Sequence, residues 1–353
     1  MRIDEVHRLA TDPAGTAGQS RLAQLTQALN KVALIASDCG LADLARELCW
    51  RQFTTLQAAA SLPAEAAQYA LEPIVNLGRL ATRRGDGGTA YQLYQDTYRA
   101  VTTGTSTNID GHDVDFGDLA PQPDGRQNLQ RFLQAILVAD GTRALTTAGL
   151  WDRVLPHLQR CNGVSERMLD GRQAAVLAYA MCGCSEQALA LIDSADTPMP
   201  WERAVAACLR TLCLRLTGRP AEGTVTAMID AYQALPLNPA AVVFHTRLGL
   251  CVGGLAAATC SAASEEITTN LVRLAVQASD AHAADLLARC LSNARTESFG
   301  LSLACIIEDA GLNQQRIPQG LLSSLTSAAE LAQAALSELI ADGTFDLRPG
   351  SDV

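Results

Sequence analysis

The densest group of side chains with acid–base or metal-binding chemistry lies between residues 110 and 118. This segment contains Asp110, His112, Asp113, Asp115 and Asp118, and carboxylate oxygens are the ligands that hard divalent cations prefer. The spacing differs from that of an EF-hand loop, which ends in a glutamate. Because Asp and Gly also favour tight turns, we interpret the segment as a solvated acidic hairpin and keep a cation site as the alternative.

The eleven cysteines are the second set of reactive groups. Cys182 and Cys184 form the tightest pair, but zinc sites normally separate paired cysteines by two or more residues and add a second pair. The cysteines are scattered singly through apolar helical patterns, which is typical of small buried residues in a reduced compartment. We therefore expect neither a metal nor a cofactor.

Two histidines have neighbours that could make them functional. His245 lies in a strongly apolar segment, where a buried imidazole usually finds a hydrogen-bond partner, and it is kept as a candidate binding residue. His282 and Asp285 are three residues apart, as a base and its orienting carboxylate would be on one helix face. Asp285 and Arg289 are four apart, and we favour an ion pair between them.

Composition limits the functional classes. The formal net charge of −10 argues against a nucleic-acid partner, because phosphate binding depends on lysine and arginine. Residues 240–260 are the most apolar stretch, but His245, Arg247 and Gly253 interrupt it, so the sequence predicts a buried helix and no membrane span. The first residues lack the apolar run of a signal peptide, which favours the cytoplasm. Lys31 is the only lysine, a bias typical of GC-rich bacterial genomes.

The elements that position these residues are helices. Apolar residues recur at i, i+3, i+4 and i+7 through nearly the whole chain, and strand-like alternation is almost absent, which predicts an all-α fold. Helices are expected at about 22–37, 41–56, 64–83, 89–102, 128–147, 151–160, 166–182, 265–279, 280–293, 301–310 and 321–340. Within the irregular segment 104–125, residues 107–109 and 114–116 flank Asp110-Gly111, so a small β-hairpin is expected there.

Glycines punctuate the helices at a regular interval. Each is expected to end a helix, and a small residue follows five positions later in most cases. These glycines are Gly40, Gly85, Gly149, Gly183, Gly218 and Gly253, and the last four are 34 or 35 residues apart. The pattern resembles the tetratricopeptide family, whose unit is a helix hairpin of about 34 residues, and the resemblance is clearest over residues 151–260. It implies a right-handed α-solenoid of stacked hairpins.

Polar residues also repeat relative to the glycines. Arginine stands six positions before the glycine in three units, as Arg79, Arg143 and Arg247, and Asn76 and Asp140 stand nine before. The resemblance implies that these positions line the concave groove, and arginine binds carboxylates with aligned pairs of donors. Arginine near a helix C-terminus can also simply complement the helix dipole. The candidate groove residues are Asn76, Arg79, Asp140, Arg143, Arg172, Arg210, His245 and Arg247.

The sequence thus predicts one solenoid in five segments. They are N-terminal hairpins (1–103), an acidic insertion (104–125), regular repeats (126–260), C-terminal helices (261–342) and a tail (343–353). We expect a non-catalytic cytoplasmic scaffold that binds a protein or peptide segment with acidic groups. The alternative is an enzyme or accessory subunit of a bacterial peptide natural-product maturation system. The ligand-sensing region of a regulator is disfavoured, because no basic helix-turn-helix segment precedes the repeats.

Overall fold

The structure is a computed structural model that describes residues 2–12, 20–59, 66–117, 119, 123–219, 222–291 and 297–343. The described chain is mostly helical, as expected, and it divides into two compact units. Unit 1 comprises Met1–Leu150 and Asn313–Val353, and unit 2 comprises Trp151–Leu312. The boundary at 150/151 falls inside the segment 126–260, and the expected tail beyond Gly343 lies outside the described residues.

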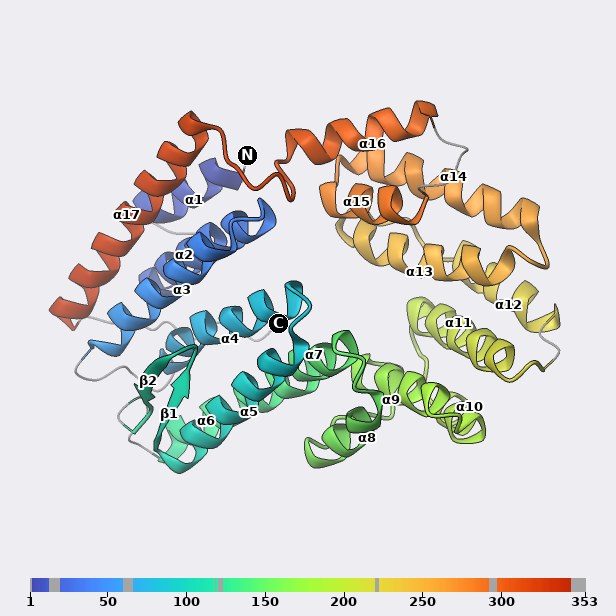
Figure 1. Ribbon diagram of the computed structural model, residues 1–353, viewed down its shortest axis with the longest axis horizontal. Coiled ribbons are helices and arrows are strands. Elements are labelled where there is room, and N and C mark those ends of the chain that lie inside the picture. The colour runs from blue at the N-terminus through green and yellow to red at the C-terminus, as the bar shows by residue number, and fades with distance from the viewer. Residues whose placement is uncertain are drawn as a thin grey trace. The chain divides into compact units, whose positions relative to one another are not determined.

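Unit 1 is built from helices that pack on their sequence neighbours, plus one hairpin (Figure 1). Its elements are α1 (Arg2–Thr11), α2 (Arg21–Asp38), α3 (Ala42–Gln57), α4 (Ala67–Arg83), α5 (Gly87–Thr103), β1 (Ser106–Ile109), β2 (His112–Asp115), α6 (Pro123–Ile136), a π-helix η1 (Leu137–Gly141), α7 (Thr142–Thr147) and α17 (Gln319–Asp342). Helix α1 is not among the predicted helices, although Val6 and Ala10 form its buried stripe.

Helix α17 departs from the expected sequential array. It packs against α1, α2 and α3, and in Figure 1 it lies beside the N-terminal helices. Before it begins, the N–H groups of Asn313 and Gln315 donate to the carbonyls of Asp38 and Cys39, both at 2.8 Å. The buried side of α17, which includes Leu325, covers apolar surface that the N-terminal helices would otherwise expose. The predicted segment 261–342 is therefore divided between the two units.

The hairpin forms where the insertion was expected to form one. Strands β1 and β2 pair antiparallel through Ile109 and His112, and Asp110 and Gly111 at the turn have φ of 56° and 84°, as a two-residue hairpin turn requires. The hairpin packs on α3, where the rings of Trp50 and His112 stack with centroids 4.1 Å apart. Asp110 accepts from Trp50 Nε1 at 3.1 Å and from Arg46 Nε.

The cation alternative for the insertion gains no support from the hairpin. Burial alone would raise the pKa of Asp110, but hydrogen bonds from Arg46 and Trp50 outweigh it and the pKa is lowered. Among the residues that the structure describes, no group of three or more His, Cys, Asp or Glu side chains is placed to hold a metal ion. Asp118, which belonged to the predicted cluster, lies outside those residues.

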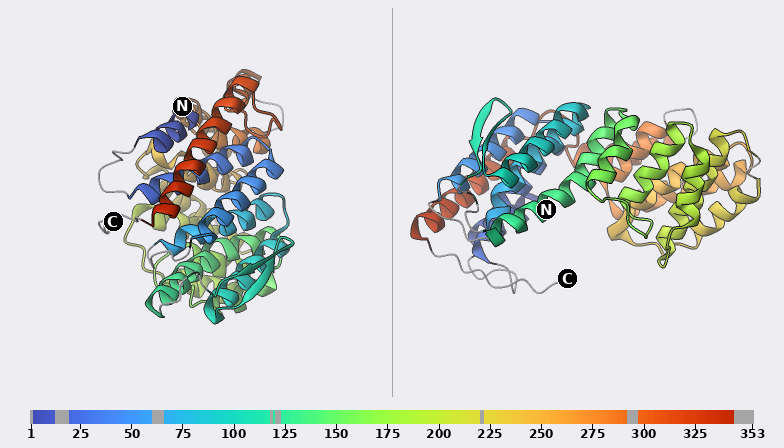
Figure 2. Two further views of the ribbon diagram at one scale, coloured as in Figure 1. Left: turned by 90° about the vertical axis from the view of Figure 1, so that its left-hand side faces the viewer. Right: turned by 90° about the horizontal axis from the view of Figure 1, so that it is seen from below.

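Unit 2 continues the pattern of paired helices (Figure 2). It contains α8 (Trp151–Arg160), α9 (Asp170–Met181), α10 (Ser185–Asp193), α11 (Pro200–Leu216), α12 (Glu222–Gln233), a 3₁₀ turn η2 (Pro239–Ala241), α13 (Val242–Ala256), α14 (Ser261–Ala278), α15 (Ala281–Cys290) and α16 (Glu297–Asp309). Alternate helices also contact one another, as α9 does α11, α11 does α13 and α13 does α15. Repeated hairpins produce this pattern when their first helices form one wall.

The glycine signal is correct at five of its six positions. Gly40, Gly85, Gly149, Gly183 and Gly218 all have positive φ, between 67° and 85°, the conformation in which glycine ends a helix. The prediction for Gly253 is wrong, since Gly253 lies inside α13. It faces α14, where an added Cβ would lie at an ordinary contact distance of 3.6 Å from Ser264 Oγ. The 34-residue interval therefore ends before α13.

The most apolar helical stretch is Pro239–Ala256. By length and composition it could cross a membrane, but 44% of that stretch is buried inside the protein and a core helix passes the same test. Within unit 2, Arg289 Nη2 lies 2.6 Å from Asp285 Oδ2, which confirms the predicted ion pair. The eleven cysteines are all free thiols, but Cys182, Cys251, Cys290 and Cys305 are exposed, so the prediction that cysteines are core residues fails for these four.

Candidate functional site

A groove of about 550 Å³ in unit 1 is lined by several charged side chains. It is lined mainly by α2, α4 and α6, alternate helices of which α4 contacts both α2 and α6. Its apolar lining includes Leu34, Leu80 and Phe132, and Leu34 is 47% exposed. The polar and charged lining consists of Thr26, Gln27, Asn30, Lys31, Ser37, Tyr69, Glu72, Asn76, Arg79 and Arg83.

One face of α4 supplies most of the charge. Glu72, Asn76, Arg79 and Arg83 follow one another at intervals of four, three and four residues, so they lie along one side of the helix. The opposite side of α4 packs against α5 at Gly78, where an added Cβ would lie 2.4 Å from the Tyr94 ring. This close contact fixes the rotation of α4 and thereby directs the polar face into the groove.

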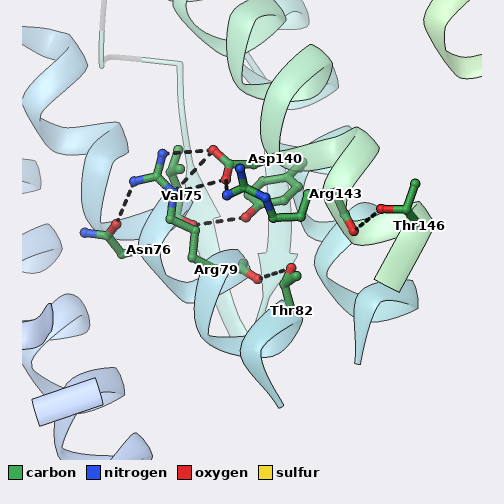
Figure 3. Close-up of polar contacts among 9 residues, drawn as sticks. Val75, Asn76, Arg79, Thr82, Asp140, Arg143 and Thr146 are labelled. Atoms are coloured by element: carbon green, nitrogen blue, oxygen red, sulfur yellow. Dashed lines mark hydrogen bonds and ion pairs between the residues drawn. The ribbon is translucent and has the colours of Figure 1, made fainter. Parts of the chain in front are cut away.

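Two of the predicted groove residues, Arg79 and Asp140, are joined by several hydrogen bonds (Figure 3). Arg79 Nη2 donates to Asp140 Oδ2 at 2.8 Å, Arg79 Nε lies 3.3 Å from both carboxylate oxygens, and Nη1 donates to Asn76 Oδ1 at 3.2 Å. The Asp140 side chain is 7% exposed and that of Arg79 is 52% exposed. The carboxylate therefore anchors a guanidinium whose outer side faces solvent.

Asp140 reaches this position from a π-helical turn. Residues Leu137–Gly141 form the π-helix η1 between α6 and α7, and such single wide turns are frequent at functional sites because they change the direction of a side chain. Arg143 follows one turn later, with Nη1 3.7 Å from Asp140 Oδ1 and a side chain 61% exposed. Figure 3 shows the guanidinium groups of Arg79 and Arg143 converging on Asp140 from different helices.

Arg83 is held in a similar way but was not predicted. Its Nη1 donates to Ser37 Oγ and to Asp38 Oδ1, both at 2.7 Å. Asp38 is the last residue of α2 and its side chain is 7% exposed. A carboxylate at a helix C-terminus is unfavourable beside the helix dipole, so Arg83 offsets this cost. The Nε and Nη2 donors of Arg83 bond to no residue in the described part of the chain.

The other end of the groove contains a carboxylate and two amides. Asn30 Nδ2 donates to Glu72 Oε2 at 2.5 Å, and Asn76 Nδ2 donates to Asn30 Oδ1 at 3.1 Å. Burial raises the pKa of Glu72, although the Asn30 hydrogen bond and the charge of Arg79 oppose the shift. Lys31 Nζ is paired with Glu5 Oε1 at 2.5 Å. The groove lining therefore contains one acid, Glu72, and three bases, each of which already has an acid beside it.

The predicted residues of unit 2 do not form one site. Arg172 is buried, and its guanidinium donates to the Ser165 and Leu191 carbonyls at 2.7 and 2.6 Å. It therefore links the segment before α9 to α10. Arg210 pairs with Asp193 beside a separate groove of about 380 Å³ between α10, α11 and α12.

The other two unit 2 candidates have simple environments. His245 is buried, burial lowers its pKa, and a hydrogen bond to the Pro236 backbone opposes that shift. This is the satisfied buried histidine that the sequence favoured. Arg247 is exposed and makes no ion pair with the part of unit 2 that the structure describes.

Of the ten polar and charged lining residues of the unit 1 groove, only Asn76 and Arg79 were predicted, and the eight that were missed include Asn30, Lys31, Glu72 and Arg83. Glu72 and Arg83 could have been found, because they lie one or two helical turns from Arg79 on the same face. Asn30 and Lys31 come from α2, and only the packing of α2 on α4 places them in the groove.

The sequence of this chain matches no protein-family model and no curated protein.

Proposed function

We propose that this protein is a non-catalytic binding protein whose unit 1 groove receives an extended segment of a peptide or protein partner with acidic groups. The proposal includes a right-handed, tetratricopeptide-like array of hairpins whose first helices line the binding surface, and the contacts of α4 with both α2 and α6 support such a wall of first helices. The proposal includes a cytoplasmic location without nucleic-acid or membrane partners, which the net charge of −10 supports in part.

One observation carries the proposal, the way the arginines are anchored. Arg79 and Arg83 each bond on one side to a carboxylate of 7% exposure, while their own side chains are 52% and 47% exposed. A guanidinium has five N–H donors in a fixed fork, so an anchored arginine keeps donors for a second carboxylate and loses little entropy on binding it. Arg143, 61% exposed, adds a third guanidinium beside them.

A selection from a library of random twelve-residue peptides tests this function. The immobilised protein should enrich peptides containing Asp and Glu, and labelled copies of these should bind in a fluorescence anisotropy titration. Removing a charged hydrogen-bond donor should weaken binding about tenfold or more, so Arg83→Gln, at a position in the groove lining, should lose that affinity.

The matched control is Arg99→Gln. Arg99 is also in unit 1 and is 70% exposed, but it pairs with Asp96 on α5, away from the groove lining. Its replacement makes the same change in net charge and should alter binding less than twofold. If no peptide is selected, or if Arg83→Gln binds as Arg99→Gln does, the groove is not an acidic-peptide site.

A catalytic alternative has one observation in its favour. Glu72 is a half-buried carboxyl with a raised pKa in a groove, and such groups are candidates for general acid–base catalysis. An enzyme or accessory subunit of a bacterial peptide natural-product maturation system would use Glu72 on a bound peptide. Selected peptides that are chemically altered by wild type and not by Glu72→Gln, as followed by mass spectrometry, would favour this alternative.

A further inference from the structure

Glu72 differs from the other charged side chains of the groove. Lys31, Arg79 and Arg83 each form an ion pair with Glu5, Asp140 or Asp38. Glu72 accepts a hydrogen bond from Asn30 through Oε2, and within the described residues it forms no ion pair.

Water is partly excluded from this carboxylate. Burial is the largest cause of the raised pKa of Glu72, and a desolvated carboxylate is stabilised most by a cation that contacts it directly. A metal ion is a poor candidate, since no cluster of three ligand side chains exists among the described residues. An ammonium or guanidinium group needs only the one carboxylate and its hydrogen-bonded neighbours.

The spacing along α4 sets the geometry of a ligand. With a rise of about 1.5 Å per residue, Glu72 lies about 10 Å from Arg79 and about 16 Å from Arg83 along the helix axis. An extended peptide advances about 3.3 Å per residue, so about three to five residues span these distances. The amides of Asn30 and Asn76 lie between the two ends, where they can bond to a peptide backbone.

We propose that Glu72 is a cation-selecting subsite, and that the partner segment carries a lysine, an arginine or a free amino group about three to five residues from its acidic group. This inference rests on the proposed function and specifies which charged groups the bound segment must carry. The arginines receive the acidic group and Glu72 receives the basic one, so the groove selects a dipolar segment over a uniformly acidic one. The order of the two groups fixes the direction in which the segment runs along α4.

The probe is a set of labelled dodecapeptides that contain one Lys and one Glu in a Ser/Ala background. The separation runs from one to eight residues in both orders, and each peptide has a matched partner with acetyl-lysine. Wild type should bind the Lys peptides about tenfold more tightly than the acetyl-lysine peptides, and best at separations of three to five in one order. This comparison needs no protein variant.

Variants then assign the preference to Glu72. Glu72→Gln keeps the Asn30 hydrogen bond and should bind Lys and acetyl-lysine peptides within twofold of each other, while it still prefers Glu over Gln at the acidic position. Arg83→Gln should still prefer Lys over acetyl-lysine peptides, but it should bind peptides with Glu or Gln at the acidic position within twofold of each other. Glu47→Gln, at an exposed position of α3 outside the groove lining, should match wild type.

The outcomes separate the two proposals. If wild type binds Lys and acetyl-lysine peptides equally but still requires Glu, the subsite is refuted and acidic-peptide binding stands. Retention of the lysine preference in Glu72→Gln would also refute it. If neither this set nor the selection yields binding, the proposed function itself is refuted.

Discussion

Replacing Asp140 with Asn should destabilise unit 1 by about 1–2 kcal/mol. Hydrogen bonds to charged groups contribute about 1.5–3 kcal/mol, and the substitution removes the charge that holds Arg79 at 2.8 Å. Asn keeps one acceptor oxygen, and the Arg79 side chain is 52% exposed, so water replaces part of the lost interaction and the lower part of the range applies. In a unit of this size the melting temperature should fall by about 2–8 °C.

The assay is urea denaturation, with hydrogen exchange followed on peptides from α4 and η1 so that unit 1 is observed by itself. Arg143→Gln is the matched control, because Arg143 lies 3.7 Å from Asp140 and is 61% exposed, and it should cost less than about 0.5 kcal/mol. A double-mutant cycle of Asp140→Asn with Arg79→Gln should give a coupling near 1 kcal/mol. Additive single effects would refute the view that Asp140 anchors Arg79.

Three further predictions concern other parts of the structure. Burial raises the pKa of Glu72, so the stability that the protonated Glu72 side chain contributes is lost as pH rises through that pKa. Glu72→Gln should therefore melt at a higher temperature than wild type at pH 7. This difference in melting temperature should vanish as pH falls below the ordinary pKa range of glutamate. Gly78→Ala should destabilise by about 1 kcal/mol in urea denaturation, because the clash with Tyr94 outweighs the gain in helix propensity. A hydrogen bond from Cys208 lowers the pKa of the exposed Cys251 thiol, so Cys208→Ala should slow iodoacetamide alkylation of Cys251 near neutral pH, as measured by mass spectrometry.

Each of these three has a control within the chain. Glu47→Gln should show no pH-dependent gain in melting temperature. Gly88→Ala, where an added Cβ meets nothing within 4 Å, should be neutral or stabilising. Alkylation of Cys305, an exposed cysteine elsewhere in unit 2, should be unaffected by Cys208→Ala, and Cys208→Ser, which keeps a donor, should preserve the rate at Cys251. Equal behaviour of any variant and its control would contradict the corresponding prediction.

The local features of the fold could be predicted from the sequence, because their causes are local. Gly85 ends α4 with φ of 85°, since glycine adopts that conformation without steric cost. The turn at Asp110-Gly111 follows from the same preference. The π-helical turn at Leu137–Gly141 and the return of α17 to α1 depend on which surfaces meet across the unit. No periodicity within the chain specifies such contacts, so the sequence did not predict them.

The site was predictable in part, because some of its residues stand at repeated positions relative to the glycines. Asn76 and Asp140 share one offset from their glycines, and Arg79 and Arg143 share another. Because the two hairpins are neighbours, the position six before one glycine meets the position nine before the next, and Arg79 contacts Asp140 although 61 residues separate them. Glu72 and Arg83 stand at other offsets on the same face of α4, so a search for repeated positions passes over them.

The charge of the groove also differs in kind from what the sequence suggests. Repeated arginines suggest a basic stripe on an acidic protein, yet the structure places Asp38 beside Arg83 and Asp140 between Arg79 and Arg143. Net attraction for an acidic group is therefore small at long range, where the total charge of −10 dominates. Recognition then depends on donors held within hydrogen-bond distance of a bound carboxylate, and these act only after the segment enters the groove. A balanced groove of this kind selects ligands by the positions of their charges along the chain, which net charge cannot report.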